Sequence, residues 1–393
     1  MLGSVLFFVI VLLAVSGLSR QVRGEREAFA VADGGDFQTE ITSILDVVRK
    51  EEEKTVHLVA VGDNLIHEGI YESAEKSGET WNYDHLYQYI KPEIQDADLA
   101  AVNQECIFVE DHDEISAYPS FGSPTEIGDA LVDAGFDIVA QANNHTFDKG
   151  VSGIRQTLKY WEEEQPDTTV LGIHGSSADA ETVQTVTCKG IRFALLNYTS
   201  QINGETYSQI PSYMIDLLRI QKVKADMEKA RKAGDMILVF LHSGQEYAKE
   251  PNRELRNFLQ IFLDEGADIV ICSHPHVLQN FETMRDEEGH EMLVYYSLGN
   301  FLSNQKKPEC MLGGMADIKI TKDEDTGEVS VAEADLIPLV THYNHEKKEY
   351  AVYKLEDYTQ ELAAEHGIHE FTEEPFTLER MKALYEDVIR QTY

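Results

Sequence analysis

The amino-acid sequence predicts an α/β fold in which two β-sheets form a sandwich with helices on the outside. From about Thr55 onward, apolar runs typical of buried strands alternate with amphipathic runs typical of helices. Glycine follows an amphipathic run and precedes an apolar one at Gly135, Gly234 and Gly266. Because glycine is favoured at the left-handed position that closes a helix, these positions predict three helix-to-strand returns. A hairpin in the middle of the chain argues against one purely parallel sheet.

The individual elements follow from these runs in chain order. The segments HLVAV, LAAV, DIVAQA, MILVFL and DIVIC predict buried strands. The central hairpin is expected over residues 185–189 and 192–198, around Lys189-Gly190, and a further strand over residues 292–301. Helices are expected near residues 84–96, 125–135, 152–163, 219–233 and 252–265.

The C-terminal residues 304–393 are expected to extend the domain formed by residues 55–303. Residues 314–342 predict two strands around Asp323-Glu324-Asp325-Thr326-Gly327, whose Asp and Gly content is typical of a hairpin turn. The tail from about Leu378 predicts a helix.

The N-terminal segment predicts an association with a membrane. Residues 1–18, MLGSVLFFVIVLLAVSGL, carry no charge, and their length lies between that of a signal-peptide core and that of a spanning helix. A cleaved signal peptide and a retained N-terminal anchor are therefore both open. Residues 19–54 are polar, and we interpret them as a spacer between the membrane and the folded body.

The composition excludes several classes of function. With 33 basic against 70 acidic residues, the formal charge of the 393-residue chain is -37, which argues against nucleic acid as a partner. The four cysteines have no CxxC spacing, so neither a zinc ribbon nor a thioredoxin-like motif is indicated. An anionic substrate would need local positive charge, and bound metal ions are a suitable source of it.

Five polar clusters each follow directly after one of the predicted buried strands. Such strand ends converge in open α/β sheets, so residues far apart in sequence can meet in one site. Asp, Glu, Asn and His side chains are suitable ligands for divalent metals. The clusters are Gly62-Asp63-Asn64, Asn103-Gln104-Glu105, Asn143-Asn144-His145-Thr146-Phe147-Asp148, His242-Ser243-Gly244-Gln245-Glu246-Tyr247 and Ser273-His274-Pro275-His276.

Each cluster alone also has an ordinary structural explanation. His274 and His276 could be solvent-facing loop histidines, Asn143 and Asn144 are common in turns, and single carboxylates often cap strand ends. Five such coincidences at five strand ends are hard to obtain from solvated loops, so together they predict a metal-type site.

The same motifs, with Tyr296-Ser297-Leu298-Gly299-Asn300-Phe301, resemble the CapA family over about residues 55–303. These are poly-γ-glutamate capsule biosynthesis proteins related to calcineurin-like metallophosphoesterases. The resemblance implies a four-layer αββα metallophosphoesterase-like sandwich on the outer face of a bacterial membrane, anchored there or secreted. It also implies two divalent metal ions, for which Mn, Zn and Fe all suit the ligand types. Membrane-bound polymer synthase subunits and an anionic capsule or wall polymer would be its partners.

The resemblance further implies roles for individual residues. Glu105 would bridge the two metals, and His145 would act beside them as general acid or transition-state stabiliser. The implied metal ligands are Asp63, Glu105, Asn144, His242, His274 and His276. Substrate contacts or supports for the ligands are expected at His67, Asn103, Asn143, Glu246, Tyr247 and Asn300.

The first motif departs from the phosphoesterase pattern. Such enzymes carry Asp-x-His, whereas Asp63 is followed by Asn64 and Leu65, and the nearest histidine is His67. One metal position is therefore expected to be short of a ligand, weak or differently filled. Two functions follow: a metal-dependent hydrolase acting on a phosphoester or amide of a surface polymer, or a non-catalytic metal-containing component of a polymer synthesis and export complex.

Overall fold

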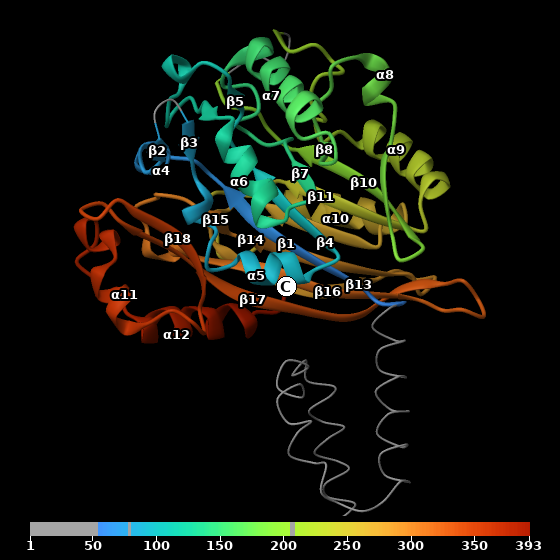
Figure 1. Cartoon of the computed structure of the whole chain (residues 1–393). Helices are drawn as coiled ribbons and strands as arrows, with labels where there is room; N and C mark the ends of the chain where they lie inside the picture. The colour runs from blue at the N-terminus through green and yellow to red at the C-terminus, as the bar shows by residue number, and fades with distance from the viewer. Residues whose placement is uncertain (1–53, 78–79, 205–208) are drawn as a thin grey trace, which may run out of the picture. The chain divides into compact units, whose positions relative to one another are not determined.

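The computed structural model describes residues 54–77, 80–204 and 209–393 (Figure 1). The predicted signal or anchor, 1–18, and the predicted spacer, 19–54, lie outside the described residues apart from Lys54. Among the described helices, none has the length and apolar character needed to cross a membrane. Val56–Tyr393 forms one compact unit.

The larger of two main sheets has eight strands in the order β18-β17-β16-β1-β4-β7-β8, with β15 also paired to β1. Strands β1, β4, β7 and β8 run parallel, and β16, β17 and β18 add to β1 in antiparallel fashion. The C-terminal strands therefore lie in the same sheet as the first strand. The bounds are β1 (Val56–Asn64), β4 (Leu99–Gln104), β7 (Ile138–Ala140), β8 (Thr169–Leu171), β15 (Asn300–Leu302), β16 (Leu312–Lys322), β17 (Val329–Asn344) and β18 (Glu349–Lys354).

The second main sheet has six strands in the order β13-β14-β12-β11-β10-β9. Its four inner strands run parallel, and β9 and β13 are antiparallel edges. The predicted central hairpin is confirmed as β9 and β10, joined by Lys189 at φ 45° and Gly190 at φ 79°. The bounds are β9 (Gln184–Cys188), β10 (Ile191–Thr199), β11 (Met236–His242), β12 (Ile269–Ser273), β13 (Leu278–Arg285) and β14 (Glu291–Leu298).

The side-chain alternation of β11 shows how the layers pack. Leu238 and Phe240 belong to the same buried cluster as Leu58 of β1, so they face the other sheet. Val239 and Leu241 point the opposite way and pack with residues of α9 and α10. A strand that is buried on both faces has no polar alternation, which explains the continuous apolar run. The predicted two-sheet sandwich with outer helices is thus confirmed.

Four of the five predicted helices are confirmed, and one is wrong. Residues 84–96 do not form a single helix but a 3₁₀ turn at Asp84–Leu86 followed by α5 (Lys91–Asp96). Pro92 lies at the start of α5, where its missing N–H costs nothing, whereas inside one longer helix it would clash with the preceding turn. The confirmed helices are α6 (Glu126–Ala134), α7 (Gly150–Glu164), α9 (Ile220–Ala233) and α10 (Arg253–Asp264).

The three predicted helix-to-strand returns are present, but for two different reasons. Gly135 and Gly266 have φ of 111° and 76° and close their helices in the left-handed conformation. Gly234 has φ −132° and is extended. A Cβ there would lie 2.6 Å from the backbone nitrogen of Ala194, so this glycine is required by the close approach of β10.

The remaining elements are short or C-terminal. The predicted C-terminal hairpin is confirmed as β16 and β17, and the predicted terminal helix as α12 (Leu378–Ile389). Strand β18 and helix α11 were not predicted. The short elements are α4 (Glu68–Glu72), β2 (Glu75–Ser77), β3 (Thr80–Asn82), β5 (Phe108–Val109), β6 (Ser123–Pro124), α8 (Ser177–Ala180) and α11 (Gln360–Glu365).

Candidate metal centre

Strand register places the predicted site residues side by side at the carboxyl ends of both sheets. In the larger sheet, Asp63 pairs with Asn103 of β4 and with Asn300 of β15. In the second sheet, His242 at the end of β11 pairs with Ser273 at the end of β12. The strand ends of the larger sheet therefore contribute carboxylate and amide groups, and those of the second sheet contribute imidazoles.

Gly62 allows β1 to reach the centre. A Cβ at this position would lie 2.0 Å from the carbonyl oxygen of Gly299, so any side chain would push the two segments apart. The pairing of β1 with β4 shifts between Val61 and Asp63, and this irregularity turns the Asp63 side chain into the site. The Gly62-Asp63 sequence is thus a structural requirement of the centre.

The turn after β12 holds two histidines in a rare backbone conformation. His274 has φ 101° and His276 has φ 58°, a region that costs energy for a side chain with a Cβ. Hydrogen bonds hold the turn: His274 N donates to Asp63 Oδ2 at 3.2 Å, and Tyr247 N donates to Pro275 O at 2.8 Å. Both imidazoles are consequently buried beside the carboxylates.

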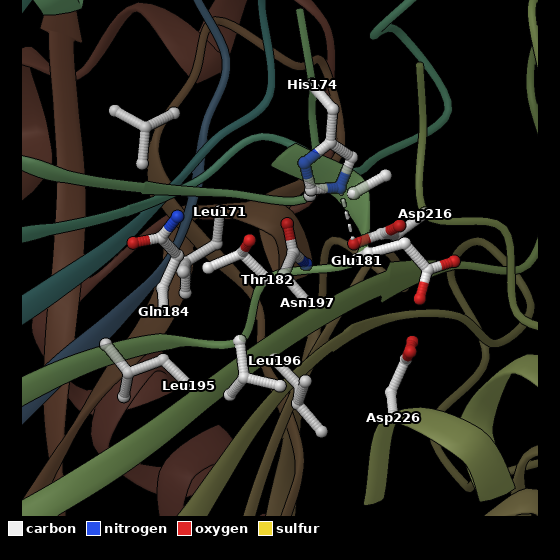
Figure 2. Close-up of a pocket in the computed structure, with 14 residues that line it drawn as sticks. Leu171, His174, Glu181, Thr182, Gln184, Leu195, Leu196, Asn197, Asp216 and Asp226 are labelled. Carbon is white, nitrogen blue, oxygen red and sulfur yellow. Dashed lines mark hydrogen bonds and ion pairs between the residues drawn. The ribbon is translucent and has the colours of Figure 1, made fainter. Parts of the chain in front are cut away.

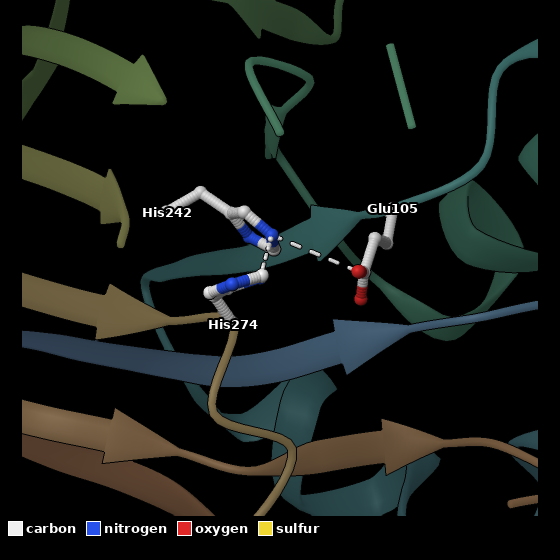
Figure 3. Close-up of side chains that lie close together, drawn as sticks. All are labelled: Glu105, His242 and His274. Atoms are coloured by element: carbon white, nitrogen blue, oxygen red, sulfur yellow. Dashed lines mark hydrogen bonds and ion pairs between the residues drawn. The ribbon is translucent and has the colours of Figure 1, made fainter. Parts of the chain in front are cut away.

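The side chains form two groups that could each hold a metal ion, and Glu105 belongs to both. One group is Asp63, Glu105 and His276; the other is Glu105, His242 and His274 (Figure 3). In each group the ligand atoms all lie within 4.8 Å of one another. Glu105 Oε1 lies 3.6 Å from His242 Nε2 and 3.7 Å from His276 Nε2. Glu105 is therefore placed where it could contact an ion in each group.

The surroundings of Glu105 fit a bound cation. Its carboxylate is fully buried, and neither oxygen has a hydrogen-bond partner among the described residues. Burial and the nearby Asp63 charge raise the pKa of Glu105 well above its usual range. A buried carboxylate without partners is costly, and a divalent ion would satisfy it.

Asp63 and His276 form a buried ion pair within the first group. Asp63 Oδ2 lies 3.0 Å from His276 Nδ1. Burial opposes ionisation of Asp63, but the bond and charge of His276 outweigh it and lower the pKa of Asp63 to about 2. Burial also opposes protonation of His276, but Glu105 and Asp63 raise its pKa to about 9. Asn103 Nδ2 donates to Asp63 Oδ1 at 2.7 Å, which fixes the carboxylate.

The imidazoles of the second group are held neutral, as metal ligands must be. Burial and the neighbouring His274 lower the pKa of His242 far below its usual value. Burial and His276 lower the pKa of His274 to about 4. His242 Nε2 lies 2.7 Å from Asn144 Oδ1, and Nδ1 lies 3.0 Å from Ser273 Oγ. Asn144 is thus placed to act as a further oxygen ligand.

His145 lies beside the centre on the turn after β7. Its Nδ1 lies 2.7 Å from Asp148 Oδ2, so this carboxylate fixes the orientation of the imidazole and turns Nε2 away from Asp148. Phe121 packs edge-on against the ring, with centroids 4.7 Å apart. Asn143 supports this turn: its Oδ1 accepts a bond from His145 N at 3.0 Å, and its Nδ2 donates to Gln104 O at 2.9 Å.

The other predicted residues occupy three different settings. Asn300 Oδ1 lies 3.0 Å from His276 Nδ1, so Asn300 supports a candidate ligand directly. Glu246 and Tyr247 are exposed, and Tyr247 contacts the Pro275 turn; the bonds that fix His242 come from Asn144 and Ser273. His67 is bonded through Nδ1 to Asn304 N at 3.2 Å, and burial lowers its pKa to about 4. It does not belong to either metal group of the described residues.

Two polar side chains that follow β10 also reach the site, although the sequence motifs did not predict them. Gln201 Nε2 lies 3.0 Å from His274 Nε2, and Asn203 Nδ2 lies 3.3 Å from His145 Nε2. They follow the apolar run ALLNY, so the signal used for the other five strand ends was present here too. The hairpin pattern predicts this strand by its turn at Lys189-Gly190 and gives no indication of what its carboxyl end faces.

A second charged cluster lies beside β8 and β10, around a separate small cavity (Figure 2). His174 Nε2 lies 2.9 Å from Asp216 Oδ2, and Lys222 Nζ lies 2.9 Å from both Asp216 and Asp226. The cavity here is only about 20 Å³. Lys222 pairs with both aspartates here, whereas no lysine or arginine of the described residues pairs with Glu105.

The layered α/β sandwich and its buried carboxylate–imidazole centre define a protein with a candidate two-metal site at the strand ends. Residues 57–305 match the family described as "Bacterial capsule synthesis protein PGA_cap", and the chain belongs to this family. It is 27% identical over 273 residues to the capsule biosynthesis protein CapA of Bacillus anthracis, covering 67% of this chain and 64% of that protein. It is 28% identical to the PGA biosynthesis protein CapA of Bacillus subtilis (strain 168), over 70% of each chain.

Two solved structures resemble the fold of this chain at low sequence identity. The NAD nucleotidase of Haemophilus influenzae is 10% identical, with a TM-score of 0.44, over 85% of this chain and 67% of that chain. The calcineurin-like phosphoesterase YfkN of Bacillus subtilis is 13% identical, with a TM-score of 0.41, over 85% of this chain and 98% of that chain. The function proposed below rests on the site itself and on family membership.

Proposed function

We propose that this chain is a metal-dependent hydrolase of capsule or surface-polymer biosynthesis that works outside the cytoplasm. Its substrate would be an anionic capsule or wall polymer of the poly-γ-glutamate type, cleaved at a phosphoester or an amide bond. Family membership supports the role in capsule biosynthesis, and the apolar N-terminal run supports the location. Membrane-bound polymer synthase subunits would be its partners.

The observation that carries the proposal is the unpartnered Glu105 carboxylate shared by two ligand groups. Asp63, Asn144 and the three buried histidines would complete the coordination of two divalent ions, with Mn, Zn and Fe all compatible. When bound, such ions polarise the scissile centre and supply hydroxide near neutral pH.

Protein groups would perform the remaining steps. His145 would hold a proton at Nε2 for the leaving group, oriented by the bond from Nδ1 to Asp148 Oδ2 at 2.7 Å. Asn203, 3.3 Å from Nε2, would contact the same part of the substrate. Asn103 and Asn300 would keep Asp63 and His276 in position.

One observation favours a non-catalytic role as the second candidate. Leu65 is buried where the phosphoesterase pattern has histidine, and His67 is bonded elsewhere. The group around Asp63 therefore has a single imidazole. In this alternative the metals hold an anionic chain for a synthesis and export complex, without turnover.

Elemental analysis of the full chain, purified without chelator, tests the shared centre. We expect about two ions per chain in the native protein and loss of metal in Glu105→Gln, because this change removes the shared negative charge. Glu110→Gln is the matched control, since Glu110 is exposed and lies five residues away. Metal content unchanged in Glu105→Gln would exclude the bridging role.

Turnover then separates the two candidates. The metal-loaded protein is incubated with phosphoester substrates and with γ-glutamyl polymers, and products are quantified. Cleavage that disappears in His145→Asn, with metal retained, supports the hydrolase. A fully metal-loaded protein that cleaves neither class but co-purifies with synthase subunits supports the assembly role.

A further inference from the structure

A groove of about 690 Å³ lies next to the turn that carries His274 and His276, and three lysines line it in an otherwise strongly acidic chain. It is formed by the segment after β1, the loop after β15 and the turn between β17 and β18. Lys306, Lys307 and Lys348 line it and are exposed. In a chain with 33 basic and 70 acidic residues, three lysines facing one groove form a local exception.

These lysines are available to a ligand. Within the described ranges, the neighbouring ion pairs use other residues, such as His345 with Glu370 at 3.2 Å, and none involves the three groove lysines. Lys307 Nζ lies 3.1 Å from the centroid of the Tyr247 ring, and Lys306 Nζ lies 4.7 Å from that of Phe371. Aromatic rings hold a cation in place without neutralising it, so both charges remain available to an anion.

Two links connect the groove to the metal centre. Tyr247 lines the groove, and its backbone N–H donates to Pro275 O, between His274 and His276. Asn300 forms the second link: its Oδ1 lies 3.0 Å from His276 Nδ1, and its Nδ2 donates to Gln305 Oε1 at 3.0 Å. Gln305 is part of the groove wall. The wall of the groove therefore adjoins the segments that carry the candidate ligands.

We propose that this groove binds a segment of a linear polyanion whose reacting bond lies at the metal centre. The inference rests on the proposed function and specifies its substrate-binding surface. A volume of about 690 Å³ is much larger than a single carboxylate or phosphate requires. Glu68 and Glu72 also line the groove; they repel an anionic chain and restrict it to the lysine-lined part. Carboxylate and phosphate chains share this chemistry.

Binding of labelled polymers to the full-length, metal-loaded protein tests the inference. The probes are poly-glutamate, polyphosphate and the neutral poly-glutamine, and affinity is measured at several salt concentrations. The groove variant combines Lys306→Gln, Lys307→Gln and Lys348→Gln. The control variant combines Lys159→Gln, Lys232→Gln and Lys319→Gln, which changes the net charge equally at lysines outside the groove whose side chains reach the surface.

We expect the groove variant to bind the preferred polyanion at least about tenfold more weakly and the control to stay within about twofold of the native protein. Native affinity should fall as salt rises, because exposed charges are screened. The polyanion that binds more tightly, poly-glutamate or polyphosphate, shows whether the groove prefers carboxylate or phosphate groups. Thermal unfolding verifies that both variants are folded, and the salt dependence of the native protein provides a measurement that needs no variant.

Equal affinity of the groove and control variants would overturn the inference, as would native binding no tighter for either polyanion than for poly-glutamine. Repeating the measurement in His145→Asn separates this result from the proposed function. Lysine-dependent binding without turnover in the native protein would reject the hydrolase but keep the groove. Turnover with lysine-independent binding would reject the groove but keep the hydrolase.

Discussion

Two regions of the molecule bury several histidines, and only one of them forms a candidate metal centre. At the strand ends, His242, His274 and His276 surround Glu105, whose carboxylate has no hydrogen-bond partner in the described structure. Near the C-terminus, His342 and His366 are equally buried, with ring centroids 5.1 Å apart. No buried carboxylate accompanies this second pair, and it belongs to neither metal group of the described residues.

The C-terminal pair makes hydrogen bonds within the protein through three of its four ring nitrogens, and only the neutral His342 Nε2 has no partner among the described residues. His366 Nε2 donates to Thr341 O at 3.0 Å, and its Nδ1 accepts a bond from Ile368 N at 2.9 Å. His342 Nδ1 lies 2.8 Å from the Tyr358 hydroxyl. Buried imidazoles are therefore compatible with an ordinary core, and the unpartnered carboxylate distinguishes the metal centre. Four predictions test this difference, in order of decreasing effect.

His145→Asn should produce the largest change, in turnover. Loss of the proton donor is expected to lower kcat by about 10²–10⁴-fold, while metal content stays at the native value because His145 belongs to neither ligand group. Parallel kinetic and elemental measurements would check this. His369→Asn, at an exposed C-terminal histidine, is the control. Native turnover in His145→Asn would remove the catalytic role.

Glu105→Gln should have opposite effects on stability with and without metal. Saturating metal at about 100 times its Kd stabilises the native protein by about 2.7 kcal/mol, and the variant should lose this gain. After chelation the variant should be at least as stable as the native protein, because the buried, unpartnered carboxylate is gone. Urea unfolding of both proteins in both states measures this inversion. A variant that is destabilised equally in both states would contradict it.

Acid should destabilise the folded protein through the C-terminal pair, His342 and His366. Burial lowers the folded-state pKa of His366 to about 3 and that of His342 to about 4. The unfolded chain takes up these protons below about pH 6.5, so this stability is complete above that pH and is lost as pH falls toward the folded values. The loss is about 1.4 kcal/mol per pH unit for each histidine.

Replacing His366 isolates its share of this pH dependence. Between pH 6 and pH 4, His366→Gln should reduce the slope of the unfolding free energy against pH by about 1.4 kcal/mol per pH unit, which corresponds to one proton. Its stability at pH 8 should also fall, because the bonds to Thr341 and Ile368 are disturbed. An unchanged slope would show that His366 is protonated in the folded state.

His345→Gln should have the smallest effect. The side chain is partly exposed, and its ion pair with Glu370 spans 3.2 Å at the surface. Such pairs contribute about 0–1 kcal/mol, so we expect a small loss in urea unfolding and no change in metal content. A loss of metal would place a C-terminal histidine in a metal site and remove the distinction between the two regions.

The sequence by itself determined which elements form and what lies at their ends. The spacing of apolar residues and the turn residues between them predicted the two-sheet sandwich, the hairpin β9–β10 and four helices. The strands could be recognised because burial on both faces produces continuous apolar runs. The residues now found together, from Asp63 to His276, could be chosen because each follows such a strand. The broken helix at residues 84–96 depends on Pro92, a local signal that the periodicity obscured.

Only the tertiary structure decided how these residues meet. Register aligns Asp63 with Asn300 across 237 positions of sequence, and the positive φ of His274 and His276 aims both imidazoles inward. The roles of Gly234 and Gln201 depend on neighbours from other strands. The environment of Glu105 also arises only on folding, since desolvation and the absence of hydrogen-bond partners are properties of the packed sandwich rather than of any local sequence.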